Sequence, residues 1–233
     1  MYIKINFAGS DKPFKKPTQE YVNRFINDLL GENNKYHDKF SNYSISQLRG
    51  GQLNENKEMI YPNGGYLFIS SQDQNFMGDI INSLFKLDSI YLQNMKYIGM
   101  VVNKRKIMPE YDIVRIECLR LKENDKNITF EDVGVENYIQ KLQEHVKKKL
   151  LNNGYDNSQL KTLEILPFHE ENWKIKYLKM KTYTDNPVIN KTSNIMICLK
   201  GNKNIRKDIL SLGFGLSTGC GCGFGLTKEL INY

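Results

Sequence analysis

Two kinds of apolar pattern alternate along the first half of the chain, and their order restricts the fold. Ile3, Ile5 and Phe7 alternate with polar residues, which predicts a half-buried strand. Residues 17–31 then carry apolar side chains at helical spacing between a proline and a glycine, which predicts a helix. A strand is therefore followed directly by a helix that can cover it.

The rest of the first half continues this pattern. Strand-like stretches cover 43–48 and 66–70 and are separated by a glycine- and asparagine-rich linker at 50–65. A capping box at residues 71–74 opens a second amphipathic helix, and a strand at 96–102 follows. The order strand, helix, strand, strand, helix, strand is typical of the ferredoxin-like unit, which also underlies the RNA recognition motif.

The second half repeats this order with one strand more. Its predicted elements are a strand at 112–121, a helix at 135–150, two strands flanking the turn at 169–172, a third strand at 193–200, a short helix at 203–211 and a last strand at 223–229. With a loop at 187–190, the extra strand indicates a hairpin insertion. We expect an α+β chain of two tandem ferredoxin-like (RRM-like, βαββαβ) domains, 1–108 and 109–233, with a C-terminal glycine-rich loop.

Composition narrows the classes of protein. An apolar fraction of 40% argues against wholesale disorder. The sequence has no run of ~18 apolar residues that could span a membrane and no signal-peptide segment at its start. The four cysteines form no CxxC pair, so we interpret them as reduced thiols. We expect a soluble cytoplasmic protein with no membrane partner.

The most unusual stretch is 213–225, where six of thirteen residues are glycine and two Gly-Phe-Gly units flank a polar centre. Such a run can wrap a phosphate-bearing ligand with its N–H groups, or it can be a tight bend. It matches neither the P-loop nor the dinucleotide-binding pattern.

These glycine units, which follow a short helix and enter a last strand, resemble the RAMP superfamily of CRISPR proteins. Within it the whole chain resembles the family of CRISPR-associated protein six, the endoribonuclease that cuts precursor CRISPR RNA within its repeats. The resemblance implies the tandem fold, RNA cleavage without cofactors, and CRISPR repeat RNA as the partner. It leaves open membership of a CRISPR effector complex and whether the protein is a monomer or a homodimer.

A shorter pattern narrows the resemblance. Tyr36-His37-Asp38-Lys39 precedes a strand that begins at Tyr43. The resemblance places His37 as the catalytic histidine, Lys39 as its lysine, and Tyr36 or Tyr43 as its tyrosine. The chemistry favours His37 independently, because histidine alone titrates near neutrality and can serve as acid or base. A nearby lysine can stabilise the crowded phosphorane. A 2′,3′-cyclic phosphate or 3′-phosphate and a 5′-hydroxyl are the expected products.

The remaining histidines are interpreted as surface residues. His145 lies mid-helix beside three lysines, and His169 lies in a turn beside two glutamates. The acidic residues are scattered, so we expect no metal requirement and no cofactor.

RNA binding is predicted for the C-terminal quarter. Residues 173–233 hold 10 basic and 3 acidic side chains, whereas residues 1–172 are neutral overall. The lysines of one strand interleave with aromatic residues, although a phase change at residues 177–178 predicts a bulge there. The predicted RNA-binding residues are Lys174, Lys176, Lys179, Lys181, Lys203, Arg206, Lys207, Gly213, Gly215, Ser217, Thr218, Gly221, Gly223 and Gly225.

One departure from the family restricts the groups with which the loop can contact RNA. Relatives often carry Lys or Arg inside it, whereas residues 216–220 here are uncharged. The loop is left with backbone amides and the hydroxyls of Ser217 and Thr218.

Two other functions compete with cleavage. A non-catalytic RAMP subunit that holds guide RNA in an effector complex would keep the loop and the basic strand but needs no histidine. A general RNA recognition module would show aromatic residues in a K/R-G-F/Y pattern, which the sequence lacks.

Overall fold

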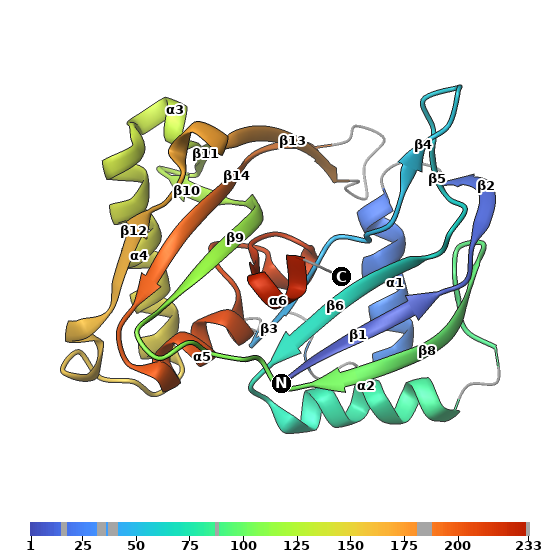
Figure 1. The fold of residues 1–233 in the computed structure, drawn as a ribbon, viewed down its shortest axis with the longest axis horizontal. Helices are drawn as coiled ribbons and strands as arrows, with labels where there is room; N and C mark the ends of the chain where they lie inside the picture. The colour runs from blue at the N-terminus through green and yellow to red at the C-terminus, as the bar shows by residue number, and fades with distance from the viewer. Residues whose placement is uncertain (15–17, 32–35, 37–41, 87–88, 181–187, 232–233) are drawn as a thin grey trace.

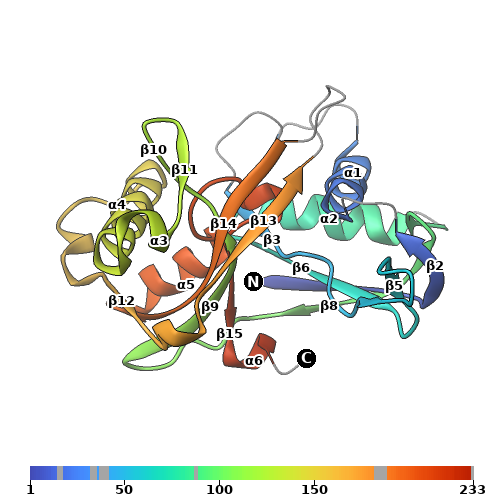
Figure 2. The same ribbon diagram turned by 90° about the horizontal axis from the view of Figure 1, so that it is seen from above.

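The computed structural model describes residues 1–14, 18–31, 36, 42–86, 89–180 and 188–231. It contains two large sheets, each with helices on one face, placed side by side (Figures 1 and 2). We call Tyr2–Asn103 the N-terminal unit and Tyr111–Ile231 the C-terminal unit. No helix within the described part of the chain is both long enough and apolar enough to cross a membrane.

The N-terminal unit has the predicted ferredoxin-like order. Its sheet runs β3 (Tyr43–Ile45), β6 (Gly65–Ser71), β1 (Tyr2–Phe7), β8 (Met95–Asn103) and β7 (Tyr91–Leu92). All neighbouring strands are antiparallel. Helices α1 (Thr18–Leu30) and α2 (Gln74–Lys86) cover the face that carries Ile3, Ile5 and Leu67. The strand period of two thus separates a helix-covered face from an outer face.

The C-terminal unit repeats this topology. Its sheet runs β12 (Glu164–Pro167), β14 (Val188–Lys200), β9 (Tyr111–Leu119) and β15 (Phe224–Thr227). Helices α4 (Val135–Asn152) and α5 (Lys203–Leu212) contribute to the core on its inner face. The tandem ferredoxin-like architecture is confirmed.

The extra strand of the second half is not a hairpin insertion. Strand β13 (Lys174–Met180) and strand β12 both pair with β14, at opposite ends of it. The 3₁₀ turn η2 (Glu170–Asn172) separates them, so they are two pieces of one edge strand. The loop expected at 187–190 is also wrong from Val188 onward, because β14 begins there and pairs with β13.

Two smaller predictions also need correction, and one short hairpin adds to the predicted elements. Asp73, not Ser71, caps α2: its Oδ1 accepts from the amides of Asn75 at 2.8 Å and Phe76 at 3.2 Å. The linker at 50–65 holds strands of a small sheet, which runs β2 (Ser10–Phe14), β5 (Met59–Tyr61) and β4 (Gln52–Leu53). A short hairpin, β10 (Leu121–Glu123) with β11 (Lys126–Ile128), precedes α3 (Phe130–Val133).

The outer faces of the two sheets meet at a third, small apolar cluster. Phe224 and Leu226 of β15 and Leu230 of α6 (Lys228–Ile231) pack against Tyr2 and Phe68 of the N-terminal sheet. The rings of Phe224 and Phe68 are stacked with centroids 6.0 Å apart. The last strand of the chain therefore belongs to the C-terminal sheet and joins the two units.

Arg105 seals this junction. Its guanidinium donates to the carbonyl oxygen of Gly225 at 2.7 Å and lies 4.9 Å from the ring centroid of Phe224. The side chain is 6% exposed, and burial lowers its pKa to about 10. A buried cation held by one carbonyl and an aromatic face ties the segment after β8 to β15.

Removal of the ring at the junction should destabilise the protein. Phe224→Ala should lower the free energy of unfolding by about 3–5 kcal/mol, because it leaves a cavity between the sheets. Phe85→Ala is the matched control, since Phe85 is 76% exposed on α2, and it should change stability by less than about 0.5 kcal/mol. Urea denaturation followed by circular dichroism measures both, and equal effects would contradict a packed junction.

Candidate functional site

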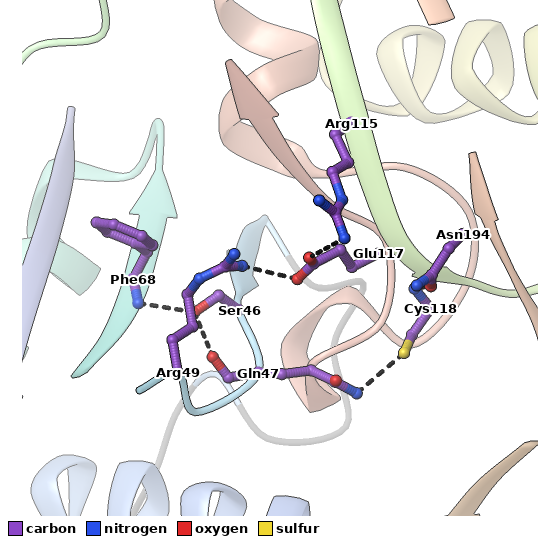
Figure 3. Close-up of polar contacts among 8 residues, drawn as sticks. All are labelled: Ser46, Gln47, Arg49, Phe68, Arg115, Glu117, Cys118 and Asn194. Atoms are coloured by element: carbon purple, nitrogen blue, oxygen red, sulfur yellow. Dashed lines mark hydrogen bonds and ion pairs between the residues drawn. The ribbon is translucent and has the colours of Figure 1, made fainter. Parts of the chain in front are cut away.

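A β-bulge lies where strand β9 faces the N-terminal unit. Ile116 pairs with Ile195 and Leu119 with Ser193, so Glu117 and Cys118 together oppose the single residue Asn194. Cys118 takes a left-handed conformation with φ of 52°, and its amide donates to Asn194 Oδ1 at 2.8 Å. Bulges re-aim side chains and often lie at functional sites. Here the bulge brings Glu117 toward the N-terminal unit (Figure 3).

Glu117 is shared by two arginines from different units. Arg49, in the segment after β3, places its Nη1 2.7 Å from Glu117 Oε2. Arg115, in β9, places its Nη2 3.4 Å from Glu117 Oε1 (Figure 3). The Glu117 and Arg49 side chains are largely shielded, whereas the Arg115 side chain is 44% exposed. Two cations around one carboxylate leave a net positive charge at the boundary of the units, with Arg115 facing solvent.

The Cys118 thiol completes the contact between the units. Gln47 donates its Nε2 to Cys118 Sγ at 3.0 Å, and nearby Ser46 Oγ accepts from the amide of Phe68 at 2.8 Å (Figure 3). Burial raises the pKa of Cys118 to about 11. The thiol therefore stays protonated at neutral pH and is a structural contact rather than a nucleophile.

The glycine-rich loop is closely packed rather than open. Gly213, Gly215, Gly221 and Gly223 are buried and have positive φ. A Cβ at Gly223 would lie 1.7 Å from the carbonyl oxygen of Phe214, and one at Gly215 would lie 2.5 Å from that of Arg120. These glycines allow the two arms of the loop to cross, since Phe214 N–H donates to Gly223 O at 2.8 Å. Their packing role explains them without a ligand.

A buried lysine on α4 donates hydrogen bonds to the glycine-rich loop. Lys149 of α4 donates its Nζ to the carbonyl oxygens of Leu212 at 3.0 Å and Gly213 at 3.2 Å, and to Thr218 Oγ1 at 3.3 Å. Burial lowers the pKa of Lys149 to about 7, while the oxygens around it favour the charged form. On the other side Arg120 donates to Ser217 Oγ at 2.9 Å. Both predicted hydroxyls are thus already engaged within the protein.

The polar centre of the loop keeps some free amides. Among the described residues, none accepts from the amides of Ser217, Thr218 or Gly219. This centre lies against the N-terminal unit, because Gly221 packs on the Gln19 side chain of α1 and Gly213 packs on Ser44 of β3. Phosphate binding by these amides stays a prediction.

The predicted catalytic residues lie at the start of β3 and before it. His37 and Lys39 are outside the described residues. Tyr36 donates its hydroxyl to Asp79 Oδ2 at 2.8 Å, and Tyr43 stacks on Phe76 with ring centroids 4.2 Å apart. Both tyrosines therefore contact α2, and Tyr43 is the one that begins β3.

The basic strand β13 has a regular register. It pairs with β14 without a shift from Lys174 opposite Asn194 to Lys179 opposite Ile189, so the predicted bulge at 177–178 is wrong. Lys174 and Lys176 are exposed and, two residues apart, share one face. Lys181 is outside the described residues. The bulge of this sheet lies in β9 instead.

One predicted RNA-binding residue is buried. Arg206 is 0% exposed, pairs with Asp112 and donates to the carbonyl oxygens of Met108 at 2.8 Å and Pro109 at 3.0 Å. It anchors α5 to the start of β9 and is not accessible to RNA, so its assignment is corrected. Lys203 and Lys207 on the same helix are exposed as expected.

The two other histidines have different surroundings. His145 is half-buried beside Lys149 and the backbone of Gly215, and burial lowers its pKa, so its interpretation as a surface residue is corrected. His169 is exposed, with Nδ1 2.8 Å from Glu171 Oε1. Within the described ranges, no three His, Cys, Asp or Glu side chains are grouped as a metal site would require.

Comparisons with known proteins identify the architecture. Neither a family model nor a curated protein matches the chain. A solved structure described as CRISPR associated protein Cas6 matches with a TM-score of 0.67 and 16% identity over 97% of this chain and 98% of that one. An RAMP protein that binds different RNA substrates matches with a TM-score of 0.72 and 16% identity over 97% and 99%. A Cas6-related protein of Pyrococcus furiosus matches with a TM-score of 0.71 and 16% identity over 98% of both chains.

The chain has the fold of Cas6-like RAMP proteins. The likeness covers nearly the whole chain, so both units and their joint belong to it. At 16% identity it concerns the backbone and does not assign any side chain.

The close crossing of the loop arms predicts that a side chain at Gly223 lowers the stability of the protein. Gly223→Ala should destabilise the protein by about 2–4 kcal/mol, because the new methyl group meets the Phe214 carbonyl in a left-handed conformation. Gly78→Ala on α2 is the control, since a Cβ there meets nothing within 4 Å, and it should stabilise the protein by up to about 1 kcal/mol. Thermal and urea unfolding compare the pair. Equal stability of both variants would show that the loop is looser than described.

Proposed function

We propose that this protein is a metal-independent endoribonuclease that binds CRISPR repeat RNA and cuts precursor CRISPR RNA. The observation that carries the proposal is the Cas6-like fold over 97% of the chain. RNA as the ligand is supported by cationic side chains beside the joint of the units, namely Arg49, Arg115, Lys174 and Lys176. We place the domain division between residues 108 and 109, with the catalytic histidine before it and the basic strand after it.

In this proposal the chemistry belongs to the segment before β3. His37 takes the proton from the 2′-hydroxyl or gives one to the departing 5′-oxygen, and Lys39 stabilises the charge on the phosphorane. Tyr36 and Tyr43 are both candidates for the tyrosine, and the Tyr36 hydroxyl donates to Asp79 Oδ2 at 2.8 Å. The 2′-hydroxyl attacks the adjacent phosphorus, the bond to the 5′-oxygen breaks, and a 2′,3′-cyclic phosphate remains.

A non-catalytic RAMP subunit that holds guide RNA in an effector complex is the second candidate. The contact of Tyr36 with Asp79 and the stacking of Tyr43 on Phe76 favour it, since both tyrosines pack as structural residues. This candidate keeps the basic surface and binds RNA without cutting it.

Cleavage in the presence of EDTA separates the two candidates. The purified protein should cut a matching repeat RNA without added metal, and a single 2′-deoxy at the cut site should abolish the reaction. His37→Ala should lower the cleavage rate by about 10²–10⁴-fold, because one proton transfer loses its catalyst, while RNA binding should be retained. His169→Ala, in an exposed turn, should cut at the normal rate.

Two results would overturn the assignment. Equal cleavage by His37→Ala and the unmodified protein would remove His37 from the mechanism. RNA binding without any cleavage would favour the non-catalytic subunit.

A further inference from the structure

A pocket opens on the outer face of the C-terminal sheet where its edge strand is interrupted. It has a volume of about 280 Å³ and is lined by Arg115, Asn172, Lys174, Asn194, Ile195 and Met196. It thus lies between β9, η2, β13 and β14, beside the bulge that carries Glu117. The gap between β12 and β13 leaves space that a continuous edge strand would fill.

The polar groups that face this pocket are mainly donors. Arg115 and Lys174 have no acceptor atoms. Asn194 is only 8% exposed, and its amide oxygen is fixed by the Cys118 N–H at 2.8 Å. Its amide nitrogen is therefore the end left for a ligand, and among the described residues none accepts from it. Two cations and an oriented NH₂ group suit an anion rich in oxygen acceptors.

The surroundings of the pocket are consistent with such an anion. Arg115 is held from one side by Glu117 at 3.4 Å, and Glu117 is itself paired more closely with Arg49 at 2.7 Å. The single carboxylate of Glu117 orients Arg115 but cannot neutralise the charges of both Arg49 and Arg115. Met196 also lines the pocket, whereas the Ile195 side chain belongs to the core of the C-terminal unit, so Arg115 and Lys174 supply the charged side chains of the lining.

We propose that Arg115, Lys174 and Asn194 form a subsite for one phosphodiester of the bound RNA strand. The proposal rests on the proposed RNA-binding function and adds a defined contact in the C-terminal unit, away from His37 in the sequence. At about 280 Å³ the pocket lies at the small end of ligand sites, which suits a phosphodiester with part of its ribose rather than stacked bases. The bulge of β9 creates the subsite because it fixes Asn194.

Asn194→Asp tests the subsite with a minimal change. The carboxylate can still accept from the Cys118 N–H, so the bulge should persist, but the donor becomes a negative oxygen. Fluorescence anisotropy with labelled repeat RNA should show binding weakened by about tenfold or more. Asn75→Asp makes the same charge change at an exposed position on α2 and should alter affinity by less than about twofold.

Arg115→Gln and Lys174→Gln leave the hydrogen bond from the Cys118 N–H to Asn194 Oδ1 in place. The Arg115→Gln/Lys174→Gln double variant should lower the slope of log affinity against log salt by about 1, as expected for one lost phosphate contact. Single methylphosphonate linkages placed along the RNA should then reveal one linkage that weakens binding to the unmodified protein. That linkage should have much less effect on the Arg115→Gln/Lys174→Gln double variant, whereas neutral linkages elsewhere should act equally on both proteins.

The outcomes separate this subsite from the proposed function. If the protein cuts repeat RNA through His37 but all three subsite variants bind with unchanged affinity and salt slope, the subsite is wrong and the function stands. If His37→Ala cuts normally while the subsite variants bind weakly, the catalytic proposal fails and the subsite stands. If the unmodified protein does not bind repeat RNA, both proposals fail.

Discussion

The stacking of Phe224 on Phe68 is the contact on which the arrangement of the two units depends. It places the last strand of the chain, β15, both in the C-terminal sheet and against the outer face of the N-terminal sheet. Arg105 closes the contact from the segment after β8. The glycine-rich loop leads directly into β15. The position of β15 in the joint of the units therefore depends on the crossing of the loop arms.

The same joint places the candidate site. With the two outer faces in contact at β15, the bulge of β9 lies beside the segment after β3, and Glu117 meets Arg49. Arg115 of β9 lines the pocket that Asn194 also lines. Arg120, just after β9, accepts from the amide of Leu216 and donates to Ser217 of the loop centre at residues 217–219. An RNA strand held there would contact both units.

The sequence allowed the main elements to be predicted because their signals are local. The alternation at Ile3, Ile5 and Phe7 and the helical spacing before Gly31 each correspond to an observed element. The division of one edge strand into β12 and β13 could not be predicted, because it depends on pairing with β14. The predicted cap of α2 is wrong because Ser71 ends β6 and its Oγ accepts from the amide of Asp73, whereas Asp73 stands directly before α2 and accepts from the amide of Asn75.

The site was harder to predict than the fold. Arg206 has the same local pattern as its exposed neighbours, and only its pairing with Asp112 on another strand shows that it is buried. Arg49, Arg115 and Asn194 were missed because they are isolated residues in three separate segments and gather only through the bulge. One signal was present in the sequence, since Arg115 and Glu117 stand two residues apart in the predicted strand, which places both on the same face.

We propose that RNA is bound where the two units meet, along β9. Photo-crosslinking of repeat RNA that carries 4-thiouridine, followed by mass spectrometry of the crosslinked peptides, tests this position of the RNA. We predict crosslinks in peptides that contain Arg115, Lys174 and the loop centre at 217–219. Crosslinks confined to α2 or to the small sheet of β2, β4 and β5 would contradict RNA binding at the joint of the units.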